Sequence, residues 1–154
     1  MKNQVKLVVQ SHKSKICNAV AERVASLRQI RTVITDRVML NSDDFGEVEL
    51  PAVQFIDLVE PSEHEKTRTK REWNFALELV MKSTQWETVT QHDLWNLSEL
   101  IIRAIGQNPN FGIPGVIHVE YLQSETDLHM VESHYIAKLN FRALYYAPFV
   151  RSEC

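Results

Sequence analysis

The fold of this chain is decided by residues 73–82, which read WNFALELVMK. The large apolar side chains recur at every second residue, whereas Asn74, Glu78 and Lys82 occupy the alternate positions. A period of two is typical of a strand that buries one face and exposes the other. The pattern therefore predicts a strand over residues 72–82 in a sheet that is covered on one side.

A second strand and a charged connection precede this segment. Residues 52–59, AVQFIDLV, have a β-rich composition and are bounded by Pro51 and Pro61. The connection, residues 60–72, holds four acids and four bases. It is too polar to bury and long for a hairpin turn, although the strand ends can extend into it. We expect this hairpin to project from the subunit rather than to fold back on its own core.

Two amphipathic helices are predicted. The first covers about residues 14–28, and an earlier start near Met1 is favoured over a late start with Ser11 or Ser14 as N-cap. The second covers about residues 89–105, with Thr88 or Thr90 as N-cap. Its apolar arc is interrupted by one serine and consists of Leu94, Trp95, Leu97, Ile101, Ile102 and Ile105.

The remaining strands complete an α+β domain. One of the short segments 32–35 and 38–40 is expected to be an edge strand, and residues 116–123 alternate Ile117, Val119 and Tyr121 against His118 and Glu120. Residues 134–146 form the last strand, with Tyr135, Ala137, Leu139, Phe141, Ala143 and Tyr145 on one face. This element order predicts a mostly antiparallel four- to five-stranded sheet with two main helices packed on one face. We expect one domain over residues 1–154, of which 1–13 are an N-terminal extension.

Composition excludes several classes of protein. Apolar residues make up 44% of the 154 residues, charged residues 24%, and the formal net charge is −3. These values are ordinary for a globular domain and argue against a dedicated nucleic-acid binder, which usually carries a basic excess. No apolar run approaches the length of a membrane-spanning helix, so no membrane partner is expected. The two cysteines, Cys17 and Cys154, are interpreted as a buried apolar residue and a terminal thiol.

Catalytic and metal sites were tested against the spacings that they require. The six histidines are scattered and form no HExxH or similar ligand pattern. A metal-dependent nuclease or hydrolase site could use Asp57, Glu78, Glu120 and Lys82, but acids that alternate with apolar residues are also what any half-solvated strand shows. Nucleophile elbows, P-loops and dinucleotide fingerprints are missing from the sequence. We therefore expect no enzyme, no cofactor and no bound metal.

The charged hairpin is the remaining candidate for function. Its basic half contains Lys66, Arg68, Lys70 and Arg71. Its acidic half contains Glu60, Glu63 and Glu65. These charges suit a solvated tip, pairing across the hairpin, or pairing between copies in a ring, where they would set the register between subunits.

Four segments carry a resemblance to a known family. They read LPAVQF (50–55), WNFALELVM (73–81), DLWNLSELI (93–101) and LNFRALY (139–145). Their order and pattern resemble the tail terminator (tail completion) proteins of long-tailed bacteriophages, with the lambda-type minor tail proteins as the nearest comparison. The resemblance covers about residues 14–147. The N-terminal segment and the Pro/Gly loop at 107–115 are longer here and inherit nothing from it.

The resemblance implies a structural virion protein at the junction of tail and neck, assembled in the host cytoplasm. Such a subunit forms a hexameric ring on the last ring of tail tube protein, stops polymerisation and offers a surface for the neck or head-completion protein. In contractile-tailed phages it also contacts the sheath, and genome DNA passes through the channel without specific binding. A ring requires two different patches on each subunit, for which Leu100 and Phe149 are candidate apolar contacts beside the basic residues of the hairpin. The alternatives are a head-completion or neck connector protein and a small metal-dependent nuclease or hydrolase.

Overall fold

The computed structural model describes residues 11–35, 46, 49–59, 62–64, 68–84, 87–127 and 134–148. Within these residues the element order is α1 (His12–Ala25), β1 (Thr32–Ile34), β2 (Ala52–Val59), β3 (Ser62–His64), β4 (Arg68–Lys82), α2 (Gln91–Gly106), β5 (Val116–Asp127) and β6 (His134–Pro148). The strands form one sheet in the order β1-β2-β4-β6-β5, and β3 pairs with one end of β4. Among the described strands, β1 and β2 pair in parallel and the other pairings are antiparallel. The α+β fold with a mostly antiparallel sheet is as the sequence predicts.

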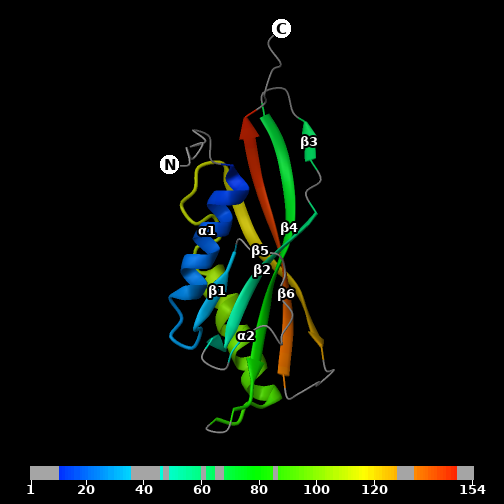
Figure 1. Ribbon diagram of the computed structural model, residues 1–154. Helices are drawn as coiled ribbons and strands as arrows, with labels where there is room; N and C mark the ends of the chain where they lie inside the picture. The colour runs from blue at the N-terminus through cyan, green and yellow to red at the C-terminus, as the bar shows by residue number, and fades with distance from the viewer. Residues whose placement is uncertain are drawn as a thin grey trace, which may run out of the picture.

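Both helices lie on the same side of the sheet (Figure 1). The predicted apolar face of β4 is buried there, together with the predicted face of β6 and the apolar stripes of both helices. The fully buried members of this core include Ile16, Val20, Val24, Phe75, Leu79, Leu94, Ile101, Leu139 and Phe141. The apolar residues that recur at every second position of the strands thus pack against those that recur at helical spacing in α1 and α2.

Aromatic rings cross the covered face of the sheet from strand to strand. Phe75 of β4 and Phe141 of β6 are directly opposite each other in the register, with ring centroids 5.5 Å apart. Phe55 of β2 stacks on Phe75 at 4.7 Å, and Tyr121 of β5 meets Phe141 edge-on at 5.8 Å. Aromatic pairs of this geometry stabilise a sheet beyond the area that they bury.

The first helix begins later than the favoured prediction. Ser11 has an extended backbone conformation and its hydroxyl accepts a hydrogen bond from the backbone N–H of Ser14, so the helix starts at His12. The late start with Ser11 as N-cap, which the sequence left open, is the one observed. Residues 1–10 lie outside the described residues.

The second helix begins at a capping box. The Thr90 hydroxyl accepts from the Asp93 N–H, and the Asp93 carboxylate accepts from the Thr90 N–H at 2.8 Å. One detail of the predicted apolar arc is wrong, because Trp95 is 48% exposed. Ser98, which interrupts the arc, is buried within it, and its hydroxyl donates to the Leu94 carbonyl at 2.7 Å.

The alternation predicted for the fifth strand is interrupted. β5 shifts register against β6 between Val116 and His118 and again between Tyr121 and Gln123. Each shift adds one residue to β5 without a partner on β6, which breaks the period of two. Val119 is buried as expected, but Ile117 and Tyr121 are 40% and 38% exposed.

The basic arm of the hairpin is part of the sheet. β4 begins at Arg68, four residues before the predicted start, and its first residues pair with β3 on one side and with the end of β6 on the other. The arm therefore continues the central strand instead of standing free. Figure 1 shows this end of β4 and β6, with β3, beyond the end of α1.

A tight contact joins the start of β5 to the helix layer. Gly115 has a φ of +88°, its carbonyl accepts from the Tyr146 N–H at 2.8 Å, and the neighbouring Pro114 carbonyl lies 3.1 Å from His12 Nε2. The His12 ring also stacks on Tyr145 at 5.4 Å. These contacts fix the first turn of α1 against β6.

Candidate functional site

The residues that the sequence singled out fall into separate regions. Lys70 and Arg71 are half-buried, and because they are consecutive in β4 they lie on opposite faces of the sheet. Leu100 is 39% exposed on α2 and lines a hollow that also includes Met81, near the other end of β4. Ten residues separate Arg71 from Met81, which is ~34 Å along an extended strand. Lys66 and Phe149 lie outside the described residues, and only the backbone of Arg68 is described.

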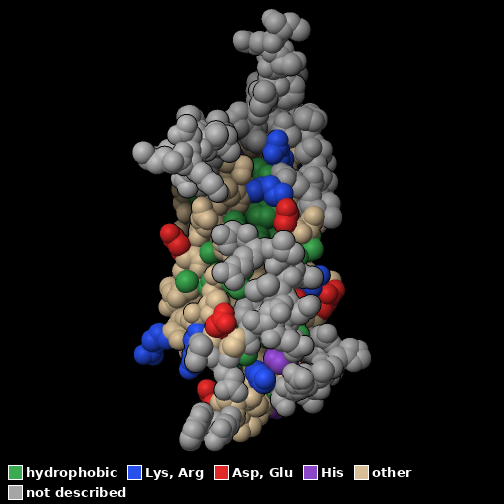
Figure 2. Space-filling model, in the orientation of Figure 1, with side chains coloured by type: hydrophobic (Ala, Val, Ile, Leu, Met, Phe, Trp, Pro, Cys, Tyr) green, Lys and Arg blue, Asp and Glu red, His purple; other side chains and the backbone are tan. Residues whose placement is uncertain are grey.

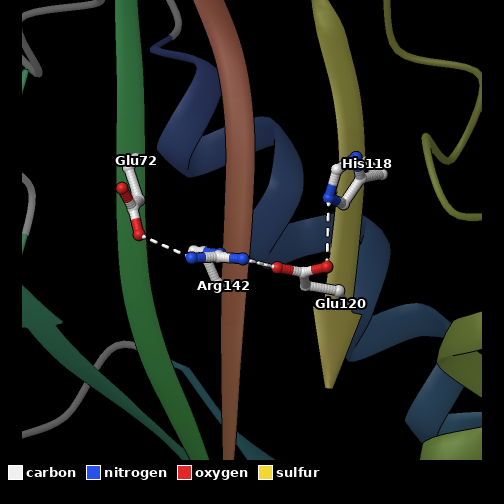
Figure 3. A network of polar contacts seen from close by, with 4 residues as sticks. All are labelled: Glu72, His118, Glu120 and Arg142. Carbon is white, nitrogen blue, oxygen red and sulfur yellow. Dashed lines mark hydrogen bonds and ion pairs between the residues drawn. The ribbon is translucent and has the colours of Figure 1, made fainter. Parts of the chain in front are cut away.

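The face of the sheet without helices carries a network of charges that crosses three strands. Arg142 of β6 lies between Glu72 of β4 and Glu120 of β5, and α1 runs behind the strands on the opposite face (Figure 3). The Nη1–H of Arg142 donates to Glu72 Oε1 at 3.1 Å, and the Nε–H of Arg142 donates to Glu120 Oε1 at 2.6 Å. The Nη2 group also contacts Glu120 Oε1. His118 Nε2 continues the network 3.3 Å from Glu120 Oε2.

This network changes the pKa values of Glu120 and Arg142. The hydrogen bond from Arg142 holds the pKa of the Glu120 carboxyl below its ordinary value, with the charges of Arg142 and His118 acting in the same direction and desolvation opposing them. Hydrogen bonds to Glu120 and Glu72 raise the pKa of Arg142. The four side chains are 35–40% exposed. The arrangement orders charges on an accessible surface, which suits recognition of a partner rather than proton transfer at neutral pH.

The four residues considered for a metal-dependent hydrolase are not brought together. Asp57 is opposite Phe75 in the register, on the helix side, where its Oδ1 accepts from the Trp73 indole at 2.7 Å. Glu78 lies on the other face and accepts from Gln54 at 2.7 Å. Glu120 is engaged by Arg142. In the part of the chain that the structure describes, no three His, Cys, Asp or Glu side chains are grouped as metal ligands would be.

The two edges of the sheet, at β1 and at β5, differ in shape and charge. Next to the start of β1, a hollow of about 460 Å³ is lined by the segment between α1 and β1, the residue before β2, the end of β4, residues 87–89 and the first half of α2. Arg28 and Arg31 belong to this lining. At the β5 edge, Ile117, Tyr121 and Leu122 are 40%, 38% and 44% exposed. The sequence signalled neither the hollow nor the charge network, because both depend on which strands become neighbours.

Charges of both signs are interspersed over the face drawn in Figure 2 rather than gathered in one basic field. This distribution differs from the electrostatic surface of a dedicated nucleic-acid binder. Among the described residues, neither helix has the length and apolar composition needed to cross a membrane.

Comparison with known proteins identifies the fold. No family model matches the sequence, and no curated protein matches it. A chain of the solved structure titled "Virion of native gene transfer agent (GTA) particle" is similar, with a TM-score of 0.63 and 10% sequence identity. The similarity covers 86% of this chain and 95% of that one. At this identity the likeness establishes a shared fold over nearly the whole of both chains.

Proposed function

We propose that this chain is a structural protein of a phage-like virion and, within that class, a tail terminator. In this role it forms a ring on the end of the tail tube, stops tube polymerisation and presents a surface to the neck or head-completion protein. The ring contacts the sheath where the tail is contractile. Genome DNA passes through its channel without specific binding.

The observation that carries the proposal is the fold. The similar chain belongs to a virion particle, and the likeness spans 95% of that chain, so it is not confined to a common substructure. The resemblance of element order to tail terminator proteins supports the more specific role. Fold alone does not define function, so the role in tail termination stands as the hypothesis to be tested.

The surface features agree with a subunit that acts by assembly. Among the described residues, ion pairs lie on the face of the sheet without helices, and exposed apolar side chains lie at the β5 edge. Mixed charges of this kind set register and partner choice more than they add affinity.

Tail assembly in the presence and absence of the protein tests the proposal. The tube protein encoded by the same genome is polymerised alone and with this protein, and tube lengths and ends are measured by electron microscopy. We expect a ring at one end of each capped tube and no further growth after tube protein is replenished. Unchanged growth with no protein bound at tube ends would contradict the tail-terminator role.

A neck connector is the alternative, because the similar chain comes from a structure of the whole virion particle. The same experiment separates the two roles when purified heads are added. A connector would bind heads without binding free tube ends, whereas a terminator binds tube ends without heads.

A further inference from the structure

We propose that the β1 edge of one subunit receives the β5 edge of a second copy of this chain, which makes a head-to-tail contact. The basic edge is defined here as Arg28, Arg31, β1 and the hollow bounded by Leu97 and Leu100. The acidic edge is defined as β5. The inference rests on the ring-forming role proposed above and identifies the surfaces that would build the ring.

The two edges lie at opposite ends of the sheet. β1 pairs only with β2 and β5 only with β6 among the described residues, and three strands separate them in the order β1-β2-β4-β6-β5. A contact between unlike patches on opposite sides of a subunit repeats from copy to copy and closes into a ring when the rotation allows it.

Charge distinguishes the edges. Residues 26–34, which lead from α1 into β1, contain Arg28 and Arg31 and no acid, and both arginines are exposed. β5 contains Glu125 and Asp127 and no lysine or arginine, in addition to Glu120, whose charge is paired with Arg142. Opposite fields at the two edges favour the head-to-tail encounter and oppose contact between two like edges.

Shape distinguishes them as well. The hollow of the basic edge has an apolar floor of Pro51, Met81, Val89, Leu97 and Leu100. The acidic edge carries Leu122 at a register shift, 44% exposed, beside Tyr121. We infer that Leu122 of one copy enters the hollow of the next, which brings Glu125, three residues along β5, to the arginines of the lining.

The remaining charges of the hollow are compatible with this orientation. Glu87 and Asp93 also line it, and the Asp93 carboxylate is already used in the capping box of α2. Arg28 and Arg31 are thus the charged groups of the lining that attract an incoming acidic strand, while Glu87 repels it.

The contact is made by side chains rather than by extension of the sheet. β5 is bulged at two places and β1 has only three residues, so neither edge presents a long regular row of backbone groups for strand addition. β5 has 12 residues. At ~3.4 Å per residue it spans ~40 Å, and a sheet with its helix layer is ~20 Å high. That strip offers up to ~800 Å² on the β5 side, which is one half of a standard interface. Because β1 has three residues and spans only ~10 Å, most of the receiving surface is the hollow and the segment that contains Arg28 and Arg31.

Two variants, each blocked at one edge, test the proposal. The basic-edge variant carries Arg28→Glu and Arg31→Glu, and the acidic-edge variant carries Leu122→Ser and Glu125→Gln, so that the two blocked edges do not attract each other. All four positions are exposed, so both variants should fold, which circular dichroism and thermal melting verify. A matched control exchanges the charges of the exposed ion pair on α2, through Glu99→Arg and Arg103→Glu.

Native mass spectrometry then reads the stoichiometry at low ionic strength. The wild type and the control are expected to form the same closed oligomer, and each edge variant alone is expected to remain a monomer of 17.9 kDa. A mixture of the two variants retains one intact basic edge and one intact acidic edge, so it should yield a heterodimer and nothing larger.

Three outcomes would overturn the inference while leaving a ring intact. In the first two, either edge variant assembles like the wild type, or only one of the two variants loses assembly. In the third, the mixture remains monomeric while the wild type assembles. A wild-type protein that remains monomeric both in solution and on tube ends would instead contradict the ring-forming role itself, and with it this interface.

Discussion

Phe141 and Arg142 are neighbours in the chain and face opposite sides of the same strand. Phe141 is fully buried under the helices and contacts rings on β4 and β5. Arg142 crosses to the same two strands through Glu72 and Glu120, on the face without helices. Adjacent residues of β6 thus link the same three strands in two ways. Aromatic contacts do so on the covered face, and ion pairs do so on the face without helices.

The difference shows what the helices contribute. Where α1 and α2 cover the sheet, removing apolar surface from water supplies the stability of the fold. Where they do not, the charges remain about one third exposed and water screens them, so their contribution to stability is small. Around Arg142 the open face can therefore carry charges for a partner at little expense to folding, whereas its other end is buried in a second apolar cluster of Ile34, Leu50, Ala52 and Val80.

The largest loss of stability is expected when a buried side chain of the covered face is truncated. Phe141→Ala should destabilise the protein by roughly 3–5 kcal/mol, because it leaves a cavity where rings of three strands meet. The measurement is the free energy of unfolding from urea denaturation, followed by circular dichroism.

Leu144→Ala is the matched control, since Leu144 lies on the open face of the same strand and is only partly buried. It should cost well under half as much. Equal losses for the two variants would mean that the open face contributes to stability as much as the covered one.

A second test concerns how rigidly the helix layer is held at the start of β5. A Cβ atom at Gly115 would lie 2.9 Å from the Tyr146 carbonyl oxygen and 3.0 Å from His12 Nε2, in a backbone conformation with φ of +88°. Gly115→Ala should therefore cost about 1–3 kcal/mol of stability.

Gly106→Ala provides the contrast, because a Cβ there meets no atom within 4 Å and the residue is helical. It should be neutral or stabilise the protein by up to ~1 kcal/mol. The midpoint of thermal unfolding reports both changes. A Gly115→Ala protein that melts with the wild type would show that the contact between His12 and the 107–115 loop is loose.

The covered face could be predicted from sequence because it depends on local periodicity. The alternation in residues 73–81 and the helical spacing of Ile16, Val20 and Val24 each indicate a buried face without reference to any other element. The helix start at His12 was harder, since apolar residues before Ser11 can extend the same stripe and the cap alone decides against them.

The open face could not be predicted in this way. Glu72, Glu120 and Arg142 meet only because β6 lies between β4 and β5, and neither the strand order nor the register is encoded in any one segment. The two bulges of β5 likewise insert Ile117 and Leu122 without partners on β6, and the residues inserted are not prolines or glycines that would mark a bulge in the sequence. The extension of β4 through the basic arm to Arg68 could not be located from the sequence, because its pairing partner is the far end of the chain, at residues 145–148.

The smallest expected effect, and the most specific to the open face, is the response of the charge network to pH. In the folded protein the pKa of Glu120 lies below its ordinary value of 4.5, chiefly because Arg142 donates to the charged carboxylate. A depressed folded pKa means that the pairing stabilises the protein above pH 4.5 and that this stabilisation is lost as the pH falls through the folded pKa. We expect Glu120→Gln to be slightly less stable than the wild type at pH 7 and equal to it below the folded pKa of Glu120, where the wild-type carboxyl is also uncharged.

Titration of the Glu120 side-chain carboxyl by NMR measures the same coupling directly. The wild type should titrate below 4.5, and Arg142→Gln should move the pKa of Glu120 upward, because desolvation then acts without the opposing hydrogen bond. Phe141→Leu, a substitution on the other face of the same strand, should leave that pKa where it is. If Glu120 titrates at 4.5 or above in the wild type, the ion pairs of the open face are not formed in solution. Contacts between strands through side chains would then be ordered on the covered face alone, and the charges of the open face would be only solvated.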